Sequence, residues 1–318
     1  MLARMNARLL VALLFLVLAV APAYAQQEPD STFDVNIARP AFSARHPRVS
    51  IDEAHHEFHT MGGRYAPFAR LMKSDGFDVI PGRDRFNAQA LAGVDILVIA
   101  NALGAEEMDD TAAAHPAFTA EEIEAVRTWV DAGGALLLIA DHAPMGSAAK
   151  SLAAAFGVDM RSSYAVDPVQ GKKGSEAVVT YVAGQGLFTD HPIVHGRDST
   201  ESLHRVTAFA GQSLSGPPHS TQLLRLSDRA EDLMVGLGEF QHVKKDQRQS
   251  AKGRAQAIAF DYGRGRVVVL GEAAMLSAQY ADMAPVNRLH YPVGLNHPGL
   301  DNRQFALNVM HWLTRLIG

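Results

Sequence analysis

Short apolar runs alternate with amphipathic segments along the first half of the chain, and this pattern predicts an α/β fold. The segment at 95–100, which is apolar after Asp95, and the apolar run at 135–140 are typical of parallel strands buried on both faces of a sheet. Shorter strands are expected at 48–52 and 77–80. Apolar residues at helical spacing predict helices at 64–74 and 147–156. Strand and helix therefore alternate, as in a parallel sheet built from right-handed crossovers.

The segment that begins at Thr119 gives the clearest helix signal. Thr119 is a candidate N-cap, and Glu122 three residues later completes a capping box. Apolar residues then recur at helical spacing from Ile123 to Val130, and the Gly-Gly pair at 133–134 ends the helix.

The pattern changes at about residue 160. Between 160 and 255, short strand-like segments stand among Gly, Pro and Ser residues, which predicts a β-rich insertion. The core resumes with a hairpin over 257–270, a helix at 272–280 and a helix from Asp301. We therefore expect an extended lead-in at 26–47 and one α/β domain at 48–318. Its fold class is a flavodoxin-like parallel sheet flanked by helices, with the insertion at about 160–255.

The first 25 residues have the layout of a secretory signal peptide. Arg4 and Arg8 precede an apolar run over 9–20, and Ala-Tyr-Ala at 23–25 provides small residues for cleavage. An uncleaved membrane anchor is the alternative, but the apolar run is short for a bilayer span. Cleavage after Ala25 would leave a periplasmic or secreted protein with no later membrane span.

Composition and charge narrow the function classes. The chain has no cysteine, which excludes thiol nucleophiles and Cys metal ligands. Its formal charge is −5, and without the two arginines of the signal peptide 27 basic residues face 34 acidic ones. This acidic balance argues against nucleic acid as a partner, and there is no polybasic segment for an anionic membrane.

Polar side chains with possible chemistry follow the ends of several predicted strands. Open parallel sheets bind ligands beyond the carboxyl ends of their strands, so these residues are expected at one edge. They are Asp52, Glu53, His55, His56 and His59 after the first strand, Asn101 after the third, Asp141 and His142 after the fourth, and Glu272 after the last.

The cluster after the first strand combines imidazoles and carboxylates, which are ligands for transition metals and groups for acid–base catalysis. His55 and His59 are four residues apart and would share a face if the segment were helical. We name His55, His59 and Asp141 as candidate ligands of a divalent transition metal, the one cofactor that the sequence leaves open. The metalloprotease motif H-E-x-x-H is absent, because His59 follows His56-Glu57 one residue too early. The alternative is a solvated polar turn with a helix-capping acid.

The candidate catalytic residues are Glu53, His56, Asp141, His142 and Glu272. Asp141 and His142 stand between a strand and a helix, where Asp141 could orient a histidine or bind a metal. Equally, Asp141 could do no more than cap the following helix. The chain has no G-x-S-x-G elbow, P-loop or G-x-G-x-x-G motif, so other familiar site types have no motif support.

Four segments together carry a family resemblance: G-A-L-L-L-I-A-D-H at 134–142, F-T-x-E-E-I at 118–123, the strand at 265–271 and D-N-R-Q-F-A-L-N-V-M-H-W-L at 301–313. Over 48–158 and 255–318 the chain resembles the class I glutamine amidotransferase-like superfamily. It is most similar to exported, uncharacterised branches such as the domain of gliding-motility auxiliary proteins. In true amidotransferases a Cys, with a downstream His–Glu pair, follows the central strand, where this chain has Asp141. The resemblance therefore implies a fold and a site location without glutaminase activity.

Two function classes follow. In the first, the chain is a hydrolase that uses His and carboxylate groups at the strand ends, with or without a metal. In the second, it is a non-catalytic periplasmic module that binds a ligand or a partner. The expected partner is a polar small molecule or a component of the cell envelope.

Overall fold

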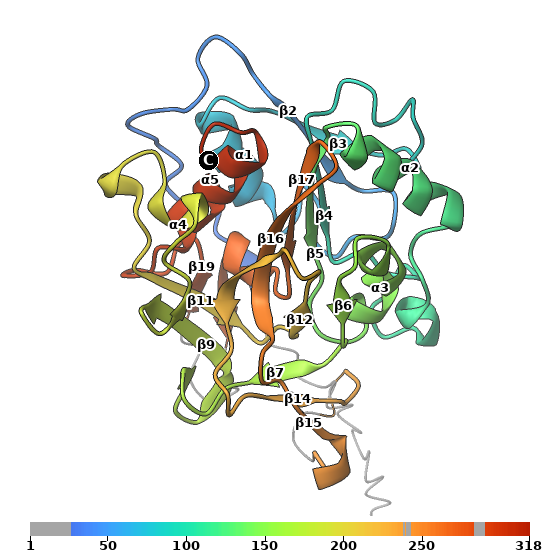
Figure 1. The fold of residues 1–318 in the computed structure, drawn as a ribbon, viewed down its shortest axis with the longest axis vertical. Coiled ribbons are helices and arrows are strands. Elements are labelled where there is room, and N and C mark those ends of the chain that lie inside the picture. The colour runs from blue at the N-terminus through green and yellow to red at the C-terminus, as the bar shows by residue number, and fades with distance from the viewer. Residues whose placement is uncertain (1–26, 238, 240–242, 283–289) are drawn as a thin grey trace, which may run out of the picture.

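A mixed sheet of 13 strands with helices on both faces forms the centre of the molecule (Figure 1). The computed structural model describes residues 27–237, 239, 243–282 and 290–318. The predicted signal peptide at 1–25 lies outside these residues.

Five strands of this sheet run parallel, as the sequence predicts. They lie in the order β3-β2-β4-β5-β17. Their bounds are β2 Arg48–Asp52, β3 Asp78–Gly82, β4 Ile96–Ala100, β5 Ala135–Ile139 and β17 Gly265–Leu270. Every residue of β4 and β5 is buried, because helices cover both faces of these strands. The continuous apolar runs therefore identified the centre of the sheet.

Antiparallel strands continue the sheet beyond β17, so it is mixed as a whole. In order from β17 they are β16 Ala255–Tyr262, β13 Thr221–Arg225, β10 Gly186–Leu187, β9 Ser175–Ala183 and β11 Arg205–Phe209, and β10 and β9 are parallel to each other. The short strands β6 Asp159–Met160, β8 Gly171–Lys172 and β12 Leu214–Ser215 pair at its margins. Segment 160–255 thus extends the same sheet, while the flavodoxin-like description of the complete fold stays a prediction.

Two small sheets lie beside the large one. In the first, β1 Gln27–Pro29 pairs with β18 Ala278–Asp282, which pairs with β19 His290–Gly294. In the second, β14 Glu231–Leu233 lies between β7 Tyr164–Val166 and β15 Arg248–Ser250. The lead-in therefore contributes a strand, and its Phe33, Val35, Ile37 and Phe42 pack against the core.

Helices form a layer on each side of the parallel strands (Figure 1). On one side lie α1 Ala66–Ser74 and α5 Asn302–Leu313, and on the other lie α2 Ala120–Asp131 and α3 Met145–Ala155. The shorter helices are α4 Pro192–His195, η1 Thr111–Ala114, η2 Ser199–Glu201, η4 Lys245–Gln247 and η5 Ala274–Leu276. The predicted capping box of α2 is present, with Thr119 and Glu122 each bonded to the other's backbone N–H.

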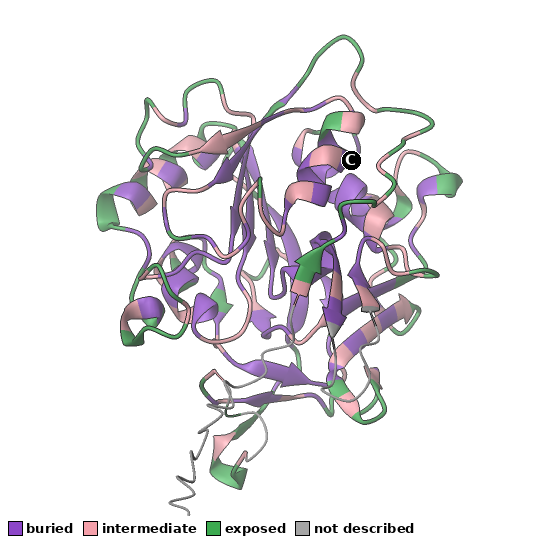
Figure 2. Cartoon of the chain, turned by 180° about the vertical axis from the view of Figure 1, so that it is seen from behind, coloured by how far each residue is buried: buried purple, intermediate pink, exposed green. Residues whose placement is uncertain are grey.

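The two faces of the central strands supply two separate hydrophobic cores. In β4, Ile96 and Val98 belong to the core shared with α1 and α5, whereas Leu97 and Ile99 belong to the core shared with α2 and α3. This alternation follows from the two-residue period of side chains along a strand. Figure 2 shows the result as a buried central sheet within a partly exposed shell.

The helix predicted at 272–280 is wrong. The turn η5 covers only Ala274–Leu276, and the chain then enters β18. The Glu272 carboxylate accepts hydrogen bonds from the backbone N–H groups of Ala274 and Met275, at 2.5 and 2.8 Å. These bonds fix one tight turn, after which pairing with β1 and β19 holds the chain extended.

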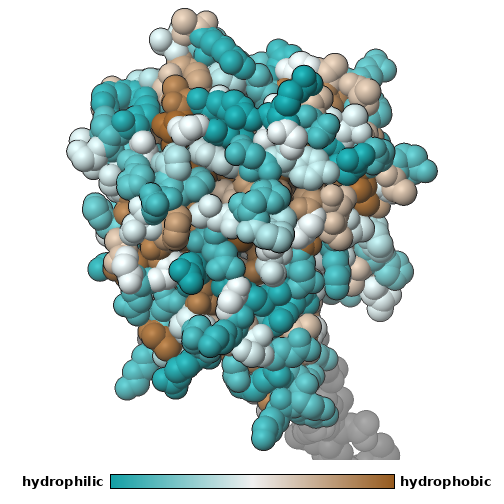
Figure 3. All heavy atoms as spheres, viewed as in Figure 1, coloured by the Kyte–Doolittle hydropathy of each residue, from teal (hydrophilic) through white to brown (hydrophobic). Residues whose placement is uncertain are grey.

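The face of the molecule seen in Figure 3 carries mostly hydrophilic side chains, with hydrophobic ones scattered among them. Within the part of the chain that the structure describes, no helix combines the length and the apolar character that crossing a bilayer requires.

Candidate functional site

The strand order reverses direction between β2 and β4, and we refer to the carboxyl ends of the strands around this point as the crevice. From β2 the chain moves outward to β3 and then returns across β2 to β4, so the connections leave this pair of strands in opposite directions. In open α/β sheets, ligands bind at such a reversal, beyond the carboxyl ends of the strands. The segment after β2 and residue Asn101 after β4 lie at these ends.

Asn101 joins three strand ends through its side chain. Its Nδ2 donates to Asp141 Oδ2 at 2.8 Å and lies 3.2 Å from His59 Nδ1, while its Oδ1 accepts the Asp141 backbone N–H at 2.8 Å. Asn101 is fully buried and has a left-handed backbone, with φ of 61°. Asparagine tolerates this conformation better than most residues do, so the chain can turn there and aim the amide at both partners.

His59 is held neutral at this crevice. Because its Nδ1 accepts from Asn101, its proton lies on Nε2, which is buried without a hydrogen-bond partner among the described residues. Burial lowers the pKa of His59 to about 3. His59 is therefore a neutral donor that points its unused N–H into the protein.

Asp141 is the carboxylate at the centre of the arrangement. Besides the bond from Asn101, its Oδ1 accepts the Ala273 backbone N–H at 3.0 Å. The residue is half-buried. Burial raises its pKa, against the charge of His142 and the two hydrogen bonds, which lower it. Each oxygen keeps a second lone pair, so Asp141 is fixed in direction but can still accept a proton.

Glu272 lies close to Asp141, and its carboxyl group accepts hydrogen bonds from the backbone. It is 1% exposed, and both oxygens accept backbone N–H groups at the start of η5. Burial, together with the negative charge of Asp141, raises its pKa well above the ordinary value. Glu272 is thus a fixed polar neighbour of Asp141 that has no open face of its own.

Segment 160–255 completes the site from the other side. The His142 ring stacks on Tyr164, with ring centroids 4.1 Å apart, and its Nδ1 bonds the Ala143 carbonyl at 2.7 Å. Gln212 donates to the carbonyls of Ala140 and Asp141 at 2.9 and 3.0 Å. The insertion therefore orients both residues at the end of β5.

A second polar cluster is formed by the segment that follows β2, and it is more deeply buried than Asp141. His55 Nδ1 lies 2.7 Å from Asp52 Oδ2, and its Nε2 lies 2.8 Å from Glu122 Oε1. The ring is packed between Phe86 and Phe118, at centroid distances of 4.5 and 4.7 Å. Every rotation of this imidazole is therefore blocked by aromatic contacts or costs a hydrogen bond.

Glu57 adds a third carboxylate to this second cluster. Its Oε2 accepts the His55 backbone N–H at 3.0 Å, and its Oε1 lies 3.8 Å from His55 Nδ1. Burial, together with the neighbouring carboxylate, raises the pKa of Glu57 to about 9, and burial raises that of Asp52 to about 6. Burial would also raise the pKa of Glu122, but hydrogen bonds from Thr119 and His55 hold it below its ordinary value.

Comparison with known proteins identifies a fold and no family. No family model and no curated protein sequence matches the chain. Among solved structures, the mmIFT52 N-terminal domain aligns with a TM-score of 0.57 and 17% identity, over 84% of this chain and 97% of that domain. The two share a fold.

Other structural neighbours are more distant. A ThuA-like protein from Bacteroides uniformis has a TM-score of 0.45 and 14% identity, over 86% of this chain and 94% of its own. A GMP synthase homologue from Thermoplasma acidophilum has a TM-score of 0.40 and 14% identity, over 85% of this chain and 97% of its own. Neighbours of the predicted amidotransferase-like class are therefore present, at low identity.

The structure brings together some of the predicted site residues and separates others. Asp141, His142 and Glu272 gather at the end of β5. Glu53 is turned to its own loop, where it accepts the Met61 N–H at 3.1 Å and lies 3.4 Å from Arg83 Nε. His56 is exposed and has a positive φ of 54°.

The predicted metal ligands His55, His59 and Asp141 do not share a position. His55 faces Asp52 and Glu122, whereas His59 and Asp141 both meet Asn101. The segment that carries the two histidines is not helical, because its side chains bond its own backbone N–H groups. Such local bonds compete with helix formation, so the expected common face does not arise.

Several residues of the site are not evident from the sequence. The sequence identifies Glu122 as part of a helix-capping box, and nothing in that pattern indicates that Glu122 also contacts His55. Asp52 and Glu57 belong to the dense acidic and histidine run, but nothing in the sequence distinguishes them from Glu53. Tyr164 and Gln212 lie in a segment without periodic pattern, so only the fold brings them to His142 and Asp141.

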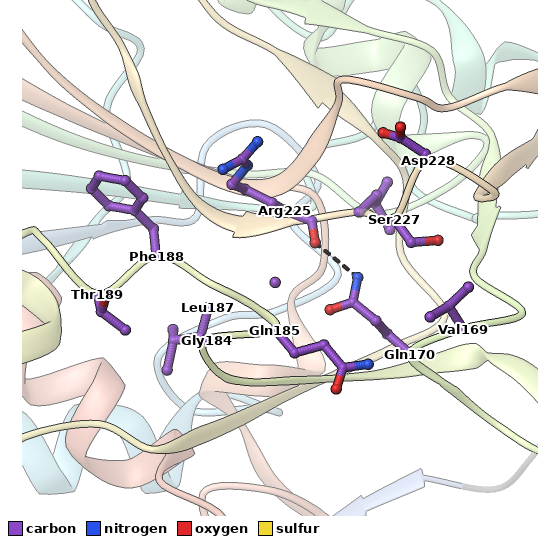
Figure 4. A pocket seen from close by; sticks show the side chains of 12 residues that line it. Val169, Gln170, Gly184, Gln185, Leu187, Phe188, Thr189, Arg225, Ser227 and Asp228 are labelled. Atoms are coloured by element: carbon purple, nitrogen blue, oxygen red, sulfur yellow. Dashed lines mark hydrogen bonds between the residues drawn. The ribbon is translucent and has the colours of Figure 1, made fainter.

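A separate cleft of about 420 Å³ lies between the β9–β10 turn and the end of β13 (Figure 4). Its wall is held by Gln170, whose amide donates to the Arg225 carbonyl at 3.0 Å. Its acid, Asp228, is paired with Lys252 at 2.9 Å. The cleft shares no lining residue with the crevice at Asp141, and its groups do not form an acid–base set.

Proposed function

We propose that the protein is an exported member of the amidotransferase-like fold class that hydrolyses a polar substrate, with Asp141 as general base. The observation that carries this proposal is the position of Asp141. It is half-buried at the strand ends, and donors from Asn101 and Ala273 fix its two oxygens. A general base needs a fixed direction and a lone pair that can accept a proton. The two hydrogen bonds fix the direction of Asp141, and each of its oxygens keeps a second lone pair.

The surroundings of Asp141 increase its strength as a base. Its burial raises its proton affinity, and a carboxylate with a raised pKa accepts a proton from water more readily near neutral pH. His142 follows directly in the chain and is half-exposed, so it can exchange a proton with a leaving group. Tyr164 holds its ring in one plane.

Glutaminase activity is no part of this proposal. The amidotransferase reaction needs a Cys nucleophile, and this chain has no cysteine. Asp141 occupies the position that the family resemblance assigns to that Cys. The retained strand-end position, without the thiol, supports water activation in place of thiol attack.

The proposed location is the periplasm or the exterior of the cell, which the signal-peptide pattern at 1–25 supports. The substrates to test are therefore carbohydrates, peptides and esters of the cell envelope. Carboxylate, imidazole and amide groups at the crevice favour a polar substrate over an apolar one.

The test is a panel of chromogenic glycosides, esters and peptides, assayed with the mature chain and with Asp141→Asn. We expect turnover by the parent and a loss of about 10²- to 10⁴-fold in the variant, the usual contribution of a general base. Asp109→Asn is the matched control, because Asp109 is exposed and takes no part in the hydrogen bonds of Asn101, Asp141 or His59. Equal rates for parent and Asp141→Asn would overturn the proposal.

The alternative is a non-catalytic module that binds a polar ligand at the same crevice. It is favoured by one observation: both oxygens of Glu272, the carboxyl group next to Asp141, accept backbone N–H groups. Calorimetry with the same compounds separates the two. A ligand that binds the parent without turnover and fails to bind Asp141→Asn would support the binding module.

A further inference from the structure

We propose that Asp52, His55 and Glu57 form a buried binding site for one divalent transition-metal ion. The site is separate from Asp141 and does not depend on the proposed function. Ligand atoms of these three residues all lie within 4.8 Å of one another, and no other such group of three occurs in the described part of the chain. Asp52 and His55 are 0% exposed and Glu57 is 7% exposed.

An unpartnered oxygen points into this cluster. Among the described residues no group donates a hydrogen bond to the buried Glu57 Oε1, whose carboxyl group faces the Asp52 carboxylate, although Oε2 of the same group accepts the His55 N–H. A buried carboxylate oxygen without a donor is costly. A bound cation at this position would satisfy the oxygen directly.

The spacing of the donor atoms fits a tetrahedral ion. With metal–ligand bonds of about 2.1 Å, tetrahedral ligands lie about 3.4 Å apart. His55 Nδ1 lies 2.7 Å from Asp52 Oδ2 and 3.8 Å from Glu57 Oε1, so the two separations bracket this value. The third pair of donor atoms, from Asp52 and Glu57, lies within 4.8 Å, so small shifts of these side chains would bring all three atoms onto one ion.

The other side of His55 is arranged as in known metal sites. A metal-binding imidazole usually donates its second N–H to a carboxylate, which fixes the tautomer and the ring orientation. With a metal bound, Nε2 would donate to Glu122 Oε1, which lies 2.8 Å away, and the lone pair would lie on Nδ1, which faces Asp52 and Glu57. Glu122 is itself fixed by backbone N–H groups of Phe86 and Thr119, at 3.2 and 3.0 Å.

The donor groups of the cluster also suit a cation. Three carboxylates, those of Asp52, Glu57 and Glu122, surround one imidazole. Arg85 lies 3.5 Å from Glu122, on the side away from His55. One imidazole and two carboxylates are ligands that suit Zn²⁺ or Mn²⁺. Because the site is closed, the ion would act structurally: it would clamp the loop after β2 onto that strand and, through Glu122, onto α2.

The first experiment measures metal content and affinity. The mature chain is purified without a histidine tag, stripped with a chelator, and titrated with Zn²⁺ and separately with Mn²⁺. We expect one tightly bound ion per chain by mass spectrometry and a rise in melting temperature on binding. Glu57→Gln should abolish both effects. Glu122→Gln should weaken the affinity by about 10- to 100-fold, as loss of an outer partner of the histidine does.

Glu57→Gln is chosen because it should fold without metal. Its amide can donate to Asp52 where the carboxylate has no donor, so loss of binding cannot be ascribed to unfolding if its melting temperature equals that of the stripped parent. The exposed His204→Ala variant controls for adventitious surface binding. Asp141→Asn should keep its metal, which separates this proposal from the hydrolase. A parent chain that binds neither ion stoichiometrically, or a Glu57→Gln variant that binds like the parent, would overturn the proposal.

Discussion

Replacing Asn101 by alanine should destabilise the protein in two ways that can be measured separately. The first is loss of the side-chain bridge to Asp141. The second is backbone strain, because alanine would have to keep the left-handed φ of 61°. Asn101→Gly loses the bridge but avoids the strain, so the pair of variants divides the effect.

The magnitudes follow from the contacts. The alanine variant leaves the Asp141 N–H without its 2.8 Å partner, which costs about 1–3 kcal/mol, and removes a bond to a charged group worth about 1.5–3 kcal/mol. A left-handed backbone adds about 1 kcal/mol for alanine and little for glycine. We therefore expect a loss of about 3.5–7 kcal/mol for Asn101→Ala and about 1 kcal/mol less for Asn101→Gly.

Urea unfolding monitored by tryptophan fluorescence measures the free energy of unfolding of both variants. Trp129 in α2 and Trp312 in α5 report on opposite sides of the sheet, so one transition should fit both. Equal stabilities for the alanine and glycine variants would refute the role of the backbone conformation. Stabilities within about 0.5 kcal/mol of the parent for both would refute the bridge itself.

Three further predictions concern residues away from the crevice. Burial lowers the pKa of His191 from 6.5 to about 4, and its Nδ1 accepts the Ile193 N–H. Between these two pKa values the unfolded chain binds a proton that the folded chain does not. The free energy of unfolding should therefore be highest above pH 6.5 and fall by about 2 kcal/mol at pH 5. In His191→Asn, which keeps the acceptor, urea titrations should show a flatter pH dependence. Thr119→Ala should cost about 1 kcal/mol in thermal unfolding and Thr119→Ser much less, as expected for a helix cap. Gly134→Ala should cost about 1–3 kcal/mol, because its Cβ would lie 2.3 Å from the Trp129 ring; a double-mutant cycle with Trp129→Leu should recover most of this loss.

The elements that the sequence predicted best are those governed by local rules. The apolar runs of β4 and β5, and the capping box at Thr119, depend on burial and on hydrogen bonds within a few residues. The helix predicted at 272–280 was wrong because the structure of this segment depends on pairing with strands that are distant in the sequence. β18 is held by β1 and β19, and β1 comes from a polar lead-in without strand pattern.

The candidate site divides in the same way. That polar residues gather at the strand ends follows from the parallel order, so the sequence could place Asp141 and His142 at the end of β5. Which histidine meets which carboxylate depends on the path of the loop after β2. There, the Glu57 and Glu53 side chains bond the N–H groups of His55 and Met61, so the loop sends His55 and His59 to different clusters.

The pairing of β5 with β17 sets the order in which the molecule can assemble. Ala135 pairs with Arg266, and the whole insertion lies between them in the chain. Contacts this distant in sequence form late, because a long segment must first be ordered or looped out. Until β17 arrives, β5 is an apolar strand with an open edge, a template for pairing with other chains. A fragment that ends before residue 265 should therefore aggregate even though it contains four of the five parallel strands.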